Sequence, residues 1–267
     1  MMLYAVIMYA WRKQDSDKPL FPDLLWSRPE NKRHAGKLLI IGGQAGEFSD
    51  VAKAFESANK AGAGSTRIIL PESLRKIAQT IPEVEFASAN KSGSFARTAL
   101  AQWFDTSEWA DHVLLGGDFG KNSETTTIID GYLLRGSRPV TLNLSSLAST
   151  GINLDQLINL SVTLVINRTV LQKLGMALGL SVPVKSTTPN ERLAEIIHQI
   201  SQGNRANLVI GDNGLVWTAS RGEVVSTQVK EIDNTNLSAI CSVWLMQNPS
   251  KPLEALATAC WEANSKA

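Results

Sequence analysis

The sequence predicts an α/β fold with a mostly parallel central sheet that helices cover on both faces. Short apolar runs alternate with amphipathic stretches through most of the 267 residues, as strands and helices do in such folds. No internal repeat and no low-complexity linker interrupts this alternation. We therefore expect a single α/β domain over residues 31–267, preceded by an N-terminal segment, residues 1–30, that leads into it.

The clearest unit is the strand–helix–strand stretch of residues 38–70. Leu38 to Ile41 is an apolar run that ends at Gly42-Gly43, which is typical of a buried parallel strand. From Asp50 to Lys60, small and apolar residues recur at three- and four-residue spacing, which predicts an amphipathic helix. Thr66 to Leu70 is rich in β-forming residues, so the unit is expected to be a right-handed crossover.

The same patterns predict the remaining elements in chain order. Strands are expected at residues 84–87, 110–115, 139–144, 162–166 and 208–210, with a hairpin formed by 214–219 and 223–229. Helices are expected at residues 72–80, 94–103, 123–134, 154–160, 168–180, 191–202, 237–246 and 252–264.

The apolar run from Met1 to Trp11 has several interpretations. It is too short to cross a bilayer, which takes roughly 20 residues, and Arg12 and Lys13 follow it rather than precede it as in a secretory signal. We favour a packing strand or helix, or a start codon assigned too early, over a weak membrane anchor. The polar segment from Asp15 to Asn31 is expected to dock on the domain through Leu20, Phe21, Leu24, Leu25 and Trp26.

Composition excludes some classes of function. A hydrophobic content of 43%, a charged content of 19% and a net charge of +1 are ordinary for a globular protein and give no electrostatic basis for binding nucleic acid. Cys241 and Cys260 lie in apolar, helix-like segments without the spacing of metal ligands. We expect them to be reduced core residues of a cytoplasmic protein that has no metal site formed by them and no membrane span.

Two glycine turns follow predicted strands and are candidates for ligand contact. Gly42, Gly43 and Gly46 form neither the dinucleotide fingerprint nor a P-loop, so their spacing alone favours a simple strand-to-helix turn. Gly116 to Gly120 follows another strand, and the backbone at its glycines can approach a ligand closely because glycine has no side chain. A pocket edge and a tight connection are both consistent with this second turn.

Two blocks in the first half resemble the ADP- or ATP-dependent NAD(P)H-hydrate dehydratases, a branch of the ribokinase-like superfamily. That family has a His-Lys-Gly turn, an apolar strand, a Gly-Gly-Ser turn and an Arg-Ala-Gly-Ala-Gly phrase. The matching stretches here are His34-Ala35-Gly36, Leu38 to Ile41, Gly42-Gly43-Gln44 and Lys60-Ala61-Gly62-Ala63-Gly64. Ala110-Asp111 to Gly120 resembles the family's Ala-Asp…Gly-Pro-Gly-Leu-Gly. The resemblance implies a ribokinase-like three-layer α/β/α fold.

The second half departs from the family pattern where the family's chemistry lies. An Asp-Ala-Asp-Ala-Leu strand end reads Asn143-Leu144-Ser145-Ser146-Leu147, and a Thr-Pro-His…Glu turn reads Val165-Ile166-Asn167…Val170. A Lys-Gly strand end is Ile210-Gly211, and the Gly-Thr-Gly-Asp entrance to a helix falls within Asp233-Asn234-Thr235-Asn236-Leu237. The family's carboxylates, histidine, lysine and glycines are therefore missing from these positions.

The last of these losses has a chemical meaning. In the superfamily, those glycines present backbone N–H groups at a helix N-terminus as an anion site, and the aspartate acts as catalytic acid or base. Asn236 or Leu237 in that place cannot accept the proton. Asp233 can substitute only if the loop is rearranged, and its alternative role is that of a helix cap or a solvated surface carboxylate.

If a site survives, the resemblance implies its residues. Asp233 would be catalytic. The substrate-binding residues would be Gly42, Gly43, Asp50, Gly116, Gly120 and Asn167. The nucleotide-binding residues would be Gly211, Asp212, Asn213, Gly214, Asn234 and Asn236, with no metal ligand assigned. Structural alternatives are a helix cap for Asp50, a turn hydrogen bond for Asn167 and a hairpin turn for Asp212-Asn213-Gly214.

Three functions follow from the resemblance. The first is a dehydratase with impaired or lost activity that uses ATP or ADP, with Mg2+, to repair NAD(P)H hydrate. The second is a non-catalytic relative that senses nucleotides or acts as a scaffold. The third, a small-molecule kinase, is weakest because phosphoryl transfer in the superfamily needs the same missing aspartate and anion site. The joint loss of residues that act as a unit favours the non-catalytic interpretation. Nucleotides are the expected partners, and family members are often homo-oligomers.

Overall fold

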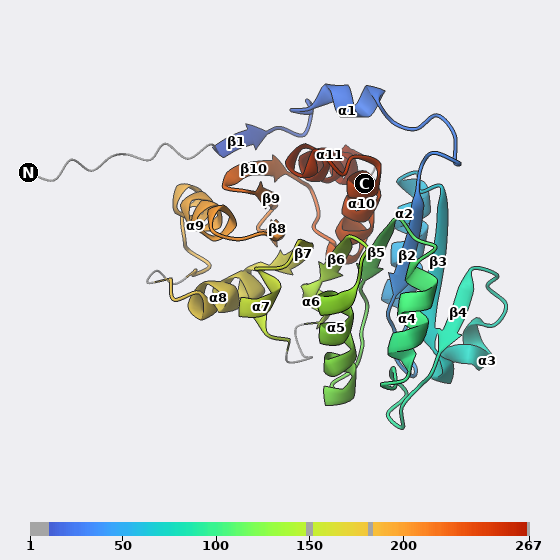
Figure 1. The fold of residues 1–267 in the computed structure, drawn as a ribbon. Coiled ribbons are helices and arrows are strands. Elements are labelled where there is room, and N and C mark those ends of the chain that lie inside the picture. The colour runs from blue at the N-terminus through green and yellow to red at the C-terminus, as the bar shows by residue number, and fades with distance from the viewer. Residues whose placement is uncertain (1–10, 148–151, 181–183, 266–267) are drawn as a thin grey trace, which may run out of the picture.

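The computed structural model describes residues 11–147, 152–180 and 184–265 (Figure 1). Within them lies a ten-stranded sheet with the order β1-β10-β9-β8-β7-β6-β5-β2-β3-β4. The strands are β1 (Trp11–Gln14), β2 (Lys37–Ile41), β3 (Ser65–Pro71), β4 (Val84–Ala87), β5 (His112–Leu115), β6 (Val140–Asn143), β7 (Val162–Asn167), β8 (Asn207–Asp212), β9 (Leu215–Ser220) and β10 (Glu223–Gln228).

The sheet is parallel over most of its width. From β8 across to β4 every neighbouring pair of strands is parallel, whereas β9 runs antiparallel to both β8 and β10. The carboxyl ends of β2 and β5 to β8 therefore meet at one edge, where open α/β sheets bind their ligands. The predicted mostly parallel α/β fold is confirmed.

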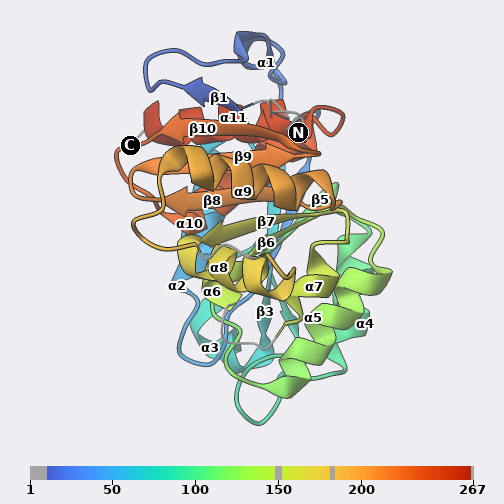
Figure 2. The ribbon, with the colours of Figure 1, turned by 90° about the vertical axis from the view of Figure 1, so that its left-hand side faces the viewer.

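Helices cover both faces, which gives three layers (Figure 2). They are α1 (Pro22–Trp26), α2 (Ser49–Lys60), α3 (Arg75–Ala78), α4 (Ala99–Ser107), α5 (Ser123–Arg135), α6 (Leu144–Leu147), α7 (Leu154–Leu157), α8 (Arg168–Ala177), α9 (Asn190–Gln202), α10 (Asn234–Gln247) and α11 (Pro252–Ser265). Successive side chains of β2 point to opposite faces of the sheet. Leu39 and Ile41 pack in the cluster that contains residues of α4, α5, α8 and α9. Leu38 and Ile40 pack with α2 and α10 on the other face.

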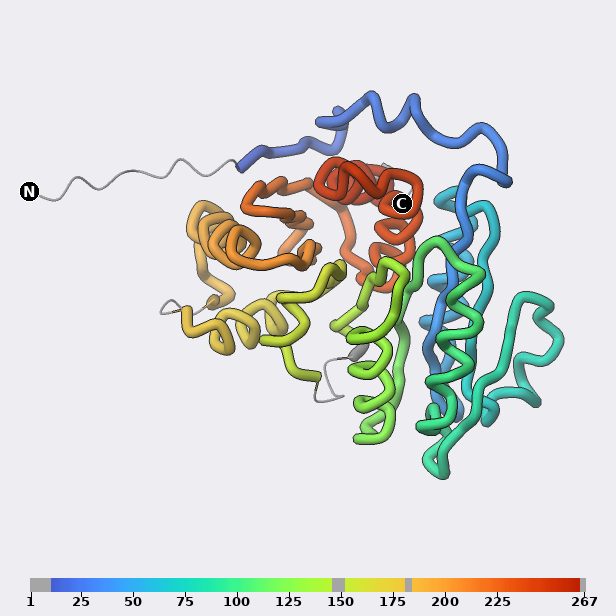
Figure 3. The backbone as a smooth tube through the Cα atoms, viewed as in Figure 1, coloured from blue at the N-terminus to red at the C-terminus, as the bar shows by residue number. Residues whose placement is uncertain are grey.

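The N-terminal segment adds an edge strand and then crosses the helical layer, as the tube in Figure 3 traces. β1 pairs in parallel with β10, with Trp11 opposite Val224. The buried Gln14 side chain amide donates to Thr227 Oγ1 at 2.9 Å and to the Ala257 carbonyl at 2.8 Å. The packing strand or helix predicted for residues 1–11 overlaps β1 only at Trp11, and the sequence predicts no element for residues 12–14 because the polar run around Lys13 shows no apolar alternation. Residues 1–10 of the predicted packing segment lie outside the described residues.

The docking residues predicted in this segment are only partly correct. Leu24 is buried, and Phe21 and Leu25 pack beside it on the cluster that includes α11. Trp26 is 88% exposed and Leu20 is 36% exposed, so their assignment as docking residues is wrong. A five-residue helix such as α1 turns only one face toward the domain, and Trp26 lies on the other.

Several helix boundaries differ from the predicted ones because polar side chains redirect the backbone. The helix predicted at 72–80 is a 3-10 turn, Glu72–Leu74, followed by the short α3. The helix predicted from residue 94 begins at Ala99, since Ser94 donates its backbone N–H to Asn90 Oδ1 and its hydroxyl to the Phe119 carbonyl. α10 begins at Asn234, before the predicted Leu237, because Asp233 caps it.

Two further expectations concern the cysteines and membrane-spanning segments. Cys241 and Cys260 are both buried and form no disulfide, as predicted. No helix in the described part of the chain combines the length and apolar character that a membrane crossing requires.

Candidate functional site

The two glycine turns at the sheet edge contact each other through their backbones. A Cβ atom at Gly42 would lie 1.8 Å from the carbonyl oxygen of Gly116. Gly117 has a φ of +88°, and a Cβ there would lie 2.8 Å from Val51 Cγ2 on α2. Packing between the β2–α2 and β5–α5 turns therefore accounts for glycine at these positions without any ligand.

The second turn is also held by side chains. Gln44 Nε2 donates to Asp118 Oδ2 at 2.5 Å, and Asp118 Oδ1 accepts the backbone N–H of Gly120 at 2.7 Å. Since Gln44 follows β2 and Asp118 follows β5, this bridge closes one turn against the other. Gly43, Gly116 and Gly120 are all buried.

Two other residues predicted to bind substrate, Asn167 and Asp50, lie at the N-terminal ends of helices. Asn167 is the N-cap of α8, and its Oδ1 accepts the backbone N–H of Val170 at 3.0 Å. Asp50 lies in the first turn of α2, where the positive end of the helix dipole stabilises its negative charge. Asn167 thus makes the turn hydrogen bond that was its structural alternative, whereas Asp50 is not the predicted helix cap, because Phe48 is the N-cap residue of α2 and no side chain caps this helix.

The predicted nucleotide-binding turn after β8 is a hairpin turn. Asn213 and Gly214 have φ values of +44° and +76°, as a tight two-residue hairpin connection requires. Asp212 forms a bidentate ion pair with Arg168, whose Nε lies 2.6 Å from Asp212 Oδ1. Their side chains are only 7% and 16% exposed, so this carboxylate is committed to the link between β8 and α8.

Asp233 lies at the N-terminus of α10 and is fully engaged there. Its Oδ1 accepts the backbone N–H groups of Thr235 at 2.9 Å and Asn236 at 3.3 Å. Its Oδ2 forms an ion pair with Lys53 of α2. The hydrogen bond to Asp233 raises the pKa of the Lys53 ammonium, and the charges of Asp233, Asp50 and Glu231 add to this rise while burial opposes it.

Further polar contacts join α10 to the elements around it. Ser57 on α2 donates to Asn236 Oδ1 at 2.5 Å, and Asn234 Nδ2 donates to Ser145 Oγ after β6 at 2.7 Å. Gly211 allows the β10–α10 loop to approach β8, because a Cβ there would lie 2.5 Å from Ile232 Cγ2. The amide groups of Asn234 and Asn236 therefore brace the start of α10.

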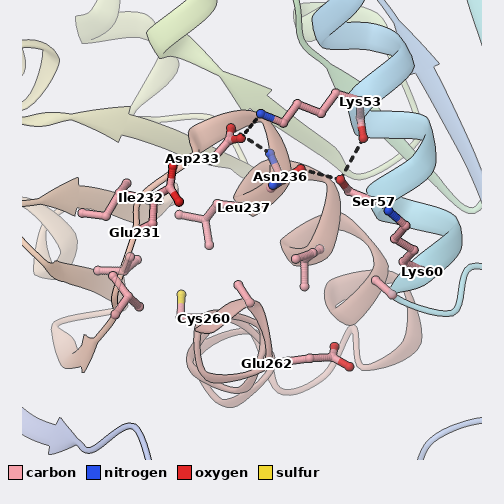
Figure 4. A pocket seen from close by; sticks show the side chains of 15 residues that line it. Lys53, Ser57, Lys60, Glu231, Ile232, Asp233, Asn236, Leu237, Cys260 and Glu262 are labelled. Atoms are coloured by element: carbon pink, nitrogen blue, oxygen red, sulfur yellow. Dashed lines mark hydrogen bonds and ion pairs between the residues drawn. The ribbon is translucent and has the colours of Figure 1, made fainter. Parts of the chain in front are cut away.

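A cavity of about 410 Å3 opens beside this helix N-terminus (Figure 4). It lies among α2, α10, α11, β9 and the loop between β10 and α10. Its lining residues are Lys53, Ser57, Lys60, Ala61, Val216, Val229, Glu231, Ile232, Asp233, Asn236, Leu237, Ile240, Cys260, Glu262 and Ala263. Figure 4 shows the α2 side chains on one side and α11, with Cys260 and Glu262, on another.

The charges around the cavity are largely paired within the protein. Glu262 accepts a bidentate ion pair from Arg28, at 2.8 and 3.0 Å, and the indole N–H of Trp244 at 2.7 Å. Lys60 lies 3.8 Å from Glu56 at the surface. The cavity therefore combines an apolar wall with a rim on which positive and negative groups nearly balance.

The site has limited chemical capacity. Asp233 is a poor candidate for a general base, because both of its oxygens already accept hydrogen bonds or an ion pair in the folded protein. The described residues contain no group of three or more histidine, cysteine, aspartate or glutamate side chains suited to a metal ion. Burial raises the pKa of the Cys260 thiol, and its contact with Cys241 adds to this, which makes it a weak nucleophile.

Only two residues of the predicted site line this cavity. Asp233 and Asn236 do so, whereas the lining of the described cavity includes none of the predicted glycines, Asp50, Asn167, Asp212, Asn213 or Asn234. Sequence reasoning missed Lys53, Ser57 and Lys60, although their spacing of four and three residues places them on one face of the predicted helix. It also missed Glu231, Cys260 and Glu262, for which the sequence contains no local signal.

Comparison with solved structures identifies the architecture. A ribokinase-like superfamily protein from Enterococcus faecalis superposes with a TM-score of 0.69 at 16% identity, over 96% of this chain and 86% of that chain. The fold is ribokinase-like. The chain matches no protein-family model and no curated protein.

Other ribokinase-like structures show how broad this fold's functions are. An ADP/ATP-dependent NAD(P)H-hydrate dehydratase from Bacillus subtilis, co-crystallized with ATP/Mg2+, has a TM-score of 0.63 at 14% identity, over 93% of this chain and 88% of that chain. Pyridoxal kinase from Lactobacillus plantarum has a TM-score of 0.54 at 16% identity, over 86% of each chain. A lyase and a kinase share the fold, so the function must be argued from the site.

Proposed function

We propose that this ribokinase-like protein binds a nucleoside or nucleotide in the cavity beside α10 and catalyses neither hydrate dehydration nor phosphoryl transfer. The observation that carries the proposal is the position of Asp233. Its carboxylate accepts the N–H groups of Thr235 and Asn236, where the family resemblance implies an anion site, and it pairs with Lys53.

The absence of catalysis follows from how these groups are used. A helix N-terminus binds a phosphate through N–H groups that have no other partner, and here an internal carboxylate accepts two of them. The position that would hold the catalytic aspartate is Asn236 or Leu237, and neither side chain can take up a proton at neutral pH. NAD(P)H-hydrate dehydratase activity is therefore expected to be lost.

Ligand binding is supported by the cavity itself. Its volume of about 410 Å3 falls within the range of small-molecule sites, roughly 300–1,000 Å3. Val216, Val229 and Leu237 offer an apolar surface for a base, and Ser57 and Asn236 place polar atoms at its edge. The Bacillus subtilis dehydratase with the same fold was crystallized with ATP/Mg2+, which favours a nucleotide-like ligand.

The proposal is tested first by an activity assay. Purified protein is incubated with NADH hydrate and either ATP or ADP, with Mg2+, and the return of the near-ultraviolet absorbance of NADH is followed. We expect no turnover above the protein-free rate, while the Bacillus subtilis dehydratase serves as the positive control.

The Asp233→Asn variant makes the result specific. The proposal would be contradicted if the wild type turned over the substrate and the folded Asp233→Asn variant did not. That result would assign Asp233 as the catalytic residue. Asparagine retains an oxygen that can cap α10, so the variant is expected to fold. Equal, background rates for both proteins are the result that we expect.

A further inference from the structure

We infer that the cavity selects a nucleoside over a nucleoside di- or triphosphate, because the charged groups that line it carry no net positive charge. This inference rests on the proposed function and specifies its ligand. Asp233 and Glu231 are the residues to which we assign the selection, since both line the cavity next to Lys53.

Charge balance is the first step of the argument. The lining holds two ammonium groups, Lys53 and Lys60, and three carboxylates, Glu231, Asp233 and Glu262, which gives a net charge of −1. Arg28 pairs with Glu262 and brings the balance to zero. A triphosphate would bring several negative charges into a site with no excess of positive charge, so its binding is disfavoured relative to that of a neutral ligand.

The second step concerns the groups that would have to receive a phosphate. Lys53 is paired with Asp233, and Lys60 lies near Glu56. A phosphate at Lys53 would compete with the Asp233 carboxylate for the ammonium group and would lie next to the negative charge of that carboxylate. In Figure 4, Asp233 and Lys53 point toward each other across the gap between α10 and α2.

The third step concerns the rest of the ligand. The cavity is also lined by Val216, Val229, Leu237, Ile240 and Ala263, which suit the flat apolar faces of a base. Ser57 and Asn236 line the cavity and are hydrogen-bonded to each other. Either side chain can instead form a hydrogen bond to a sugar hydroxyl of the ligand. A neutral nucleoside matches both the apolar wall and the balanced rim.

Calorimetric titration of the full-length protein with adenosine, AMP and ATP tests this inference. For the wild type we expect adenosine to bind at least about tenfold more tightly than ATP, with AMP between them. In Glu231→Gln, which leaves the α10 cap in place, ATP affinity is expected to rise about fivefold while adenosine affinity stays unchanged. The double variant Glu231→Gln/Asp233→Asn is expected to reduce the preference for adenosine over ATP further.

The control variant is Asp105→Asn, which removes an exposed carboxylate from α4, away from the cavity. It should change none of the affinities, and thermal unfolding of each variant establishes that it is folded. Wild-type binding of ATP as tight as or tighter than that of adenosine overturns the inference and leaves the proposed function standing. Unchanged ATP affinity in both cavity variants also overturns it, whereas binding of none of the three ligands overturns the proposed function itself.

Discussion

Gly42 matches a family motif and also has a packing role in this structure. The sequence showed a glycine pair after a buried strand, and both a ligand contact and a tight turn were consistent with it. The structure provides the packing reason, since a Cβ at Gly42 would overlap the carbonyl oxygen of Gly116 at 1.8 Å. The sequence could not reveal this contact, because it joins two loops that are distant in the chain.

His112 is a residue whose protonation affects folding. It is fully buried on β5, its Nε2 lies 2.9 Å from Thr141 Oγ1, and burial lowers its pKa to about 4. Its pKa in the unfolded chain is about 6.5, so the unfolded state binds more protons between these two values. Stability contributed by neutral His112 is therefore fully present above about pH 6.5 and is lost as the pH falls toward about 4.

We expect His112→Gln to reduce the acid sensitivity of the protein. Glutamine can still bond to Thr141 but does not titrate, so its free energy of unfolding should fall less between about pH 7 and pH 5 than that of the wild type. The expected difference is about 2 kcal/mol, measured by urea unfolding at both pH values. If the free energy of unfolding fell equally with pH in the two proteins, protonation of His112 would not be a cause of the acid sensitivity.

At the scale of elements, the pairing of α2 with α10 builds the candidate site. The ion pair Lys53–Asp233 and the hydrogen bond Ser57–Asn236 join these two helices, which are far apart in the sequence. The apolar face of α2 could be predicted from its spacing of small and apolar residues. Which helix its polar face would meet depends on the order of strands in the sheet, and no local pattern encodes it.

The N-terminal segment is fastened to the helical layer by Arg28. Its guanidinium donates to both oxygens of Glu262 and to the Ala61 carbonyl, and it stacks on the ring of Trp244 at 4.6 Å. The Glu262 side chain is only 4% exposed, so removing its guanidinium partner leaves a poorly solvated carboxylate. We expect Arg28→Ala to lower the free energy of unfolding by about 3 kcal/mol in denaturant titrations.

Arg12 is the matched control in the same segment. It pairs with Glu223, but the two side chains are 40% and 56% exposed, so Arg12→Ala should cost less than about 1 kcal/mol. Equal losses from the two substitutions would show that burial of the ion pair does not determine the stability of this segment.

At the scale of the whole molecule, the parallel sheet could be predicted and the cavity could not. Apolar runs marked most of the strands, and their alternation with helices implied the layers. The cavity combines α2 with the C-terminal helices and the β9–β10 hairpin, which are distant in sequence. The predicted site followed the family's motif positions, and at several of them this chain has caps, turns and ion pairs.

The measurement that tests the central claim most directly is thermal unfolding with and without adenosine, for the wild type and a variant with a filled cavity. Ile240→Trp places a large ring in the cavity lining, and Met176→Trp adds the same ring at an exposed position outside it. Adenosine at about 100 times its dissociation constant should raise the wild-type Tm by roughly 5–10 °C. We predict the same rise for Met176→Trp and none for Ile240→Trp. The claim would be contradicted if adenosine, AMP and ATP all left the wild-type Tm unchanged, or if the rise persisted in Ile240→Trp.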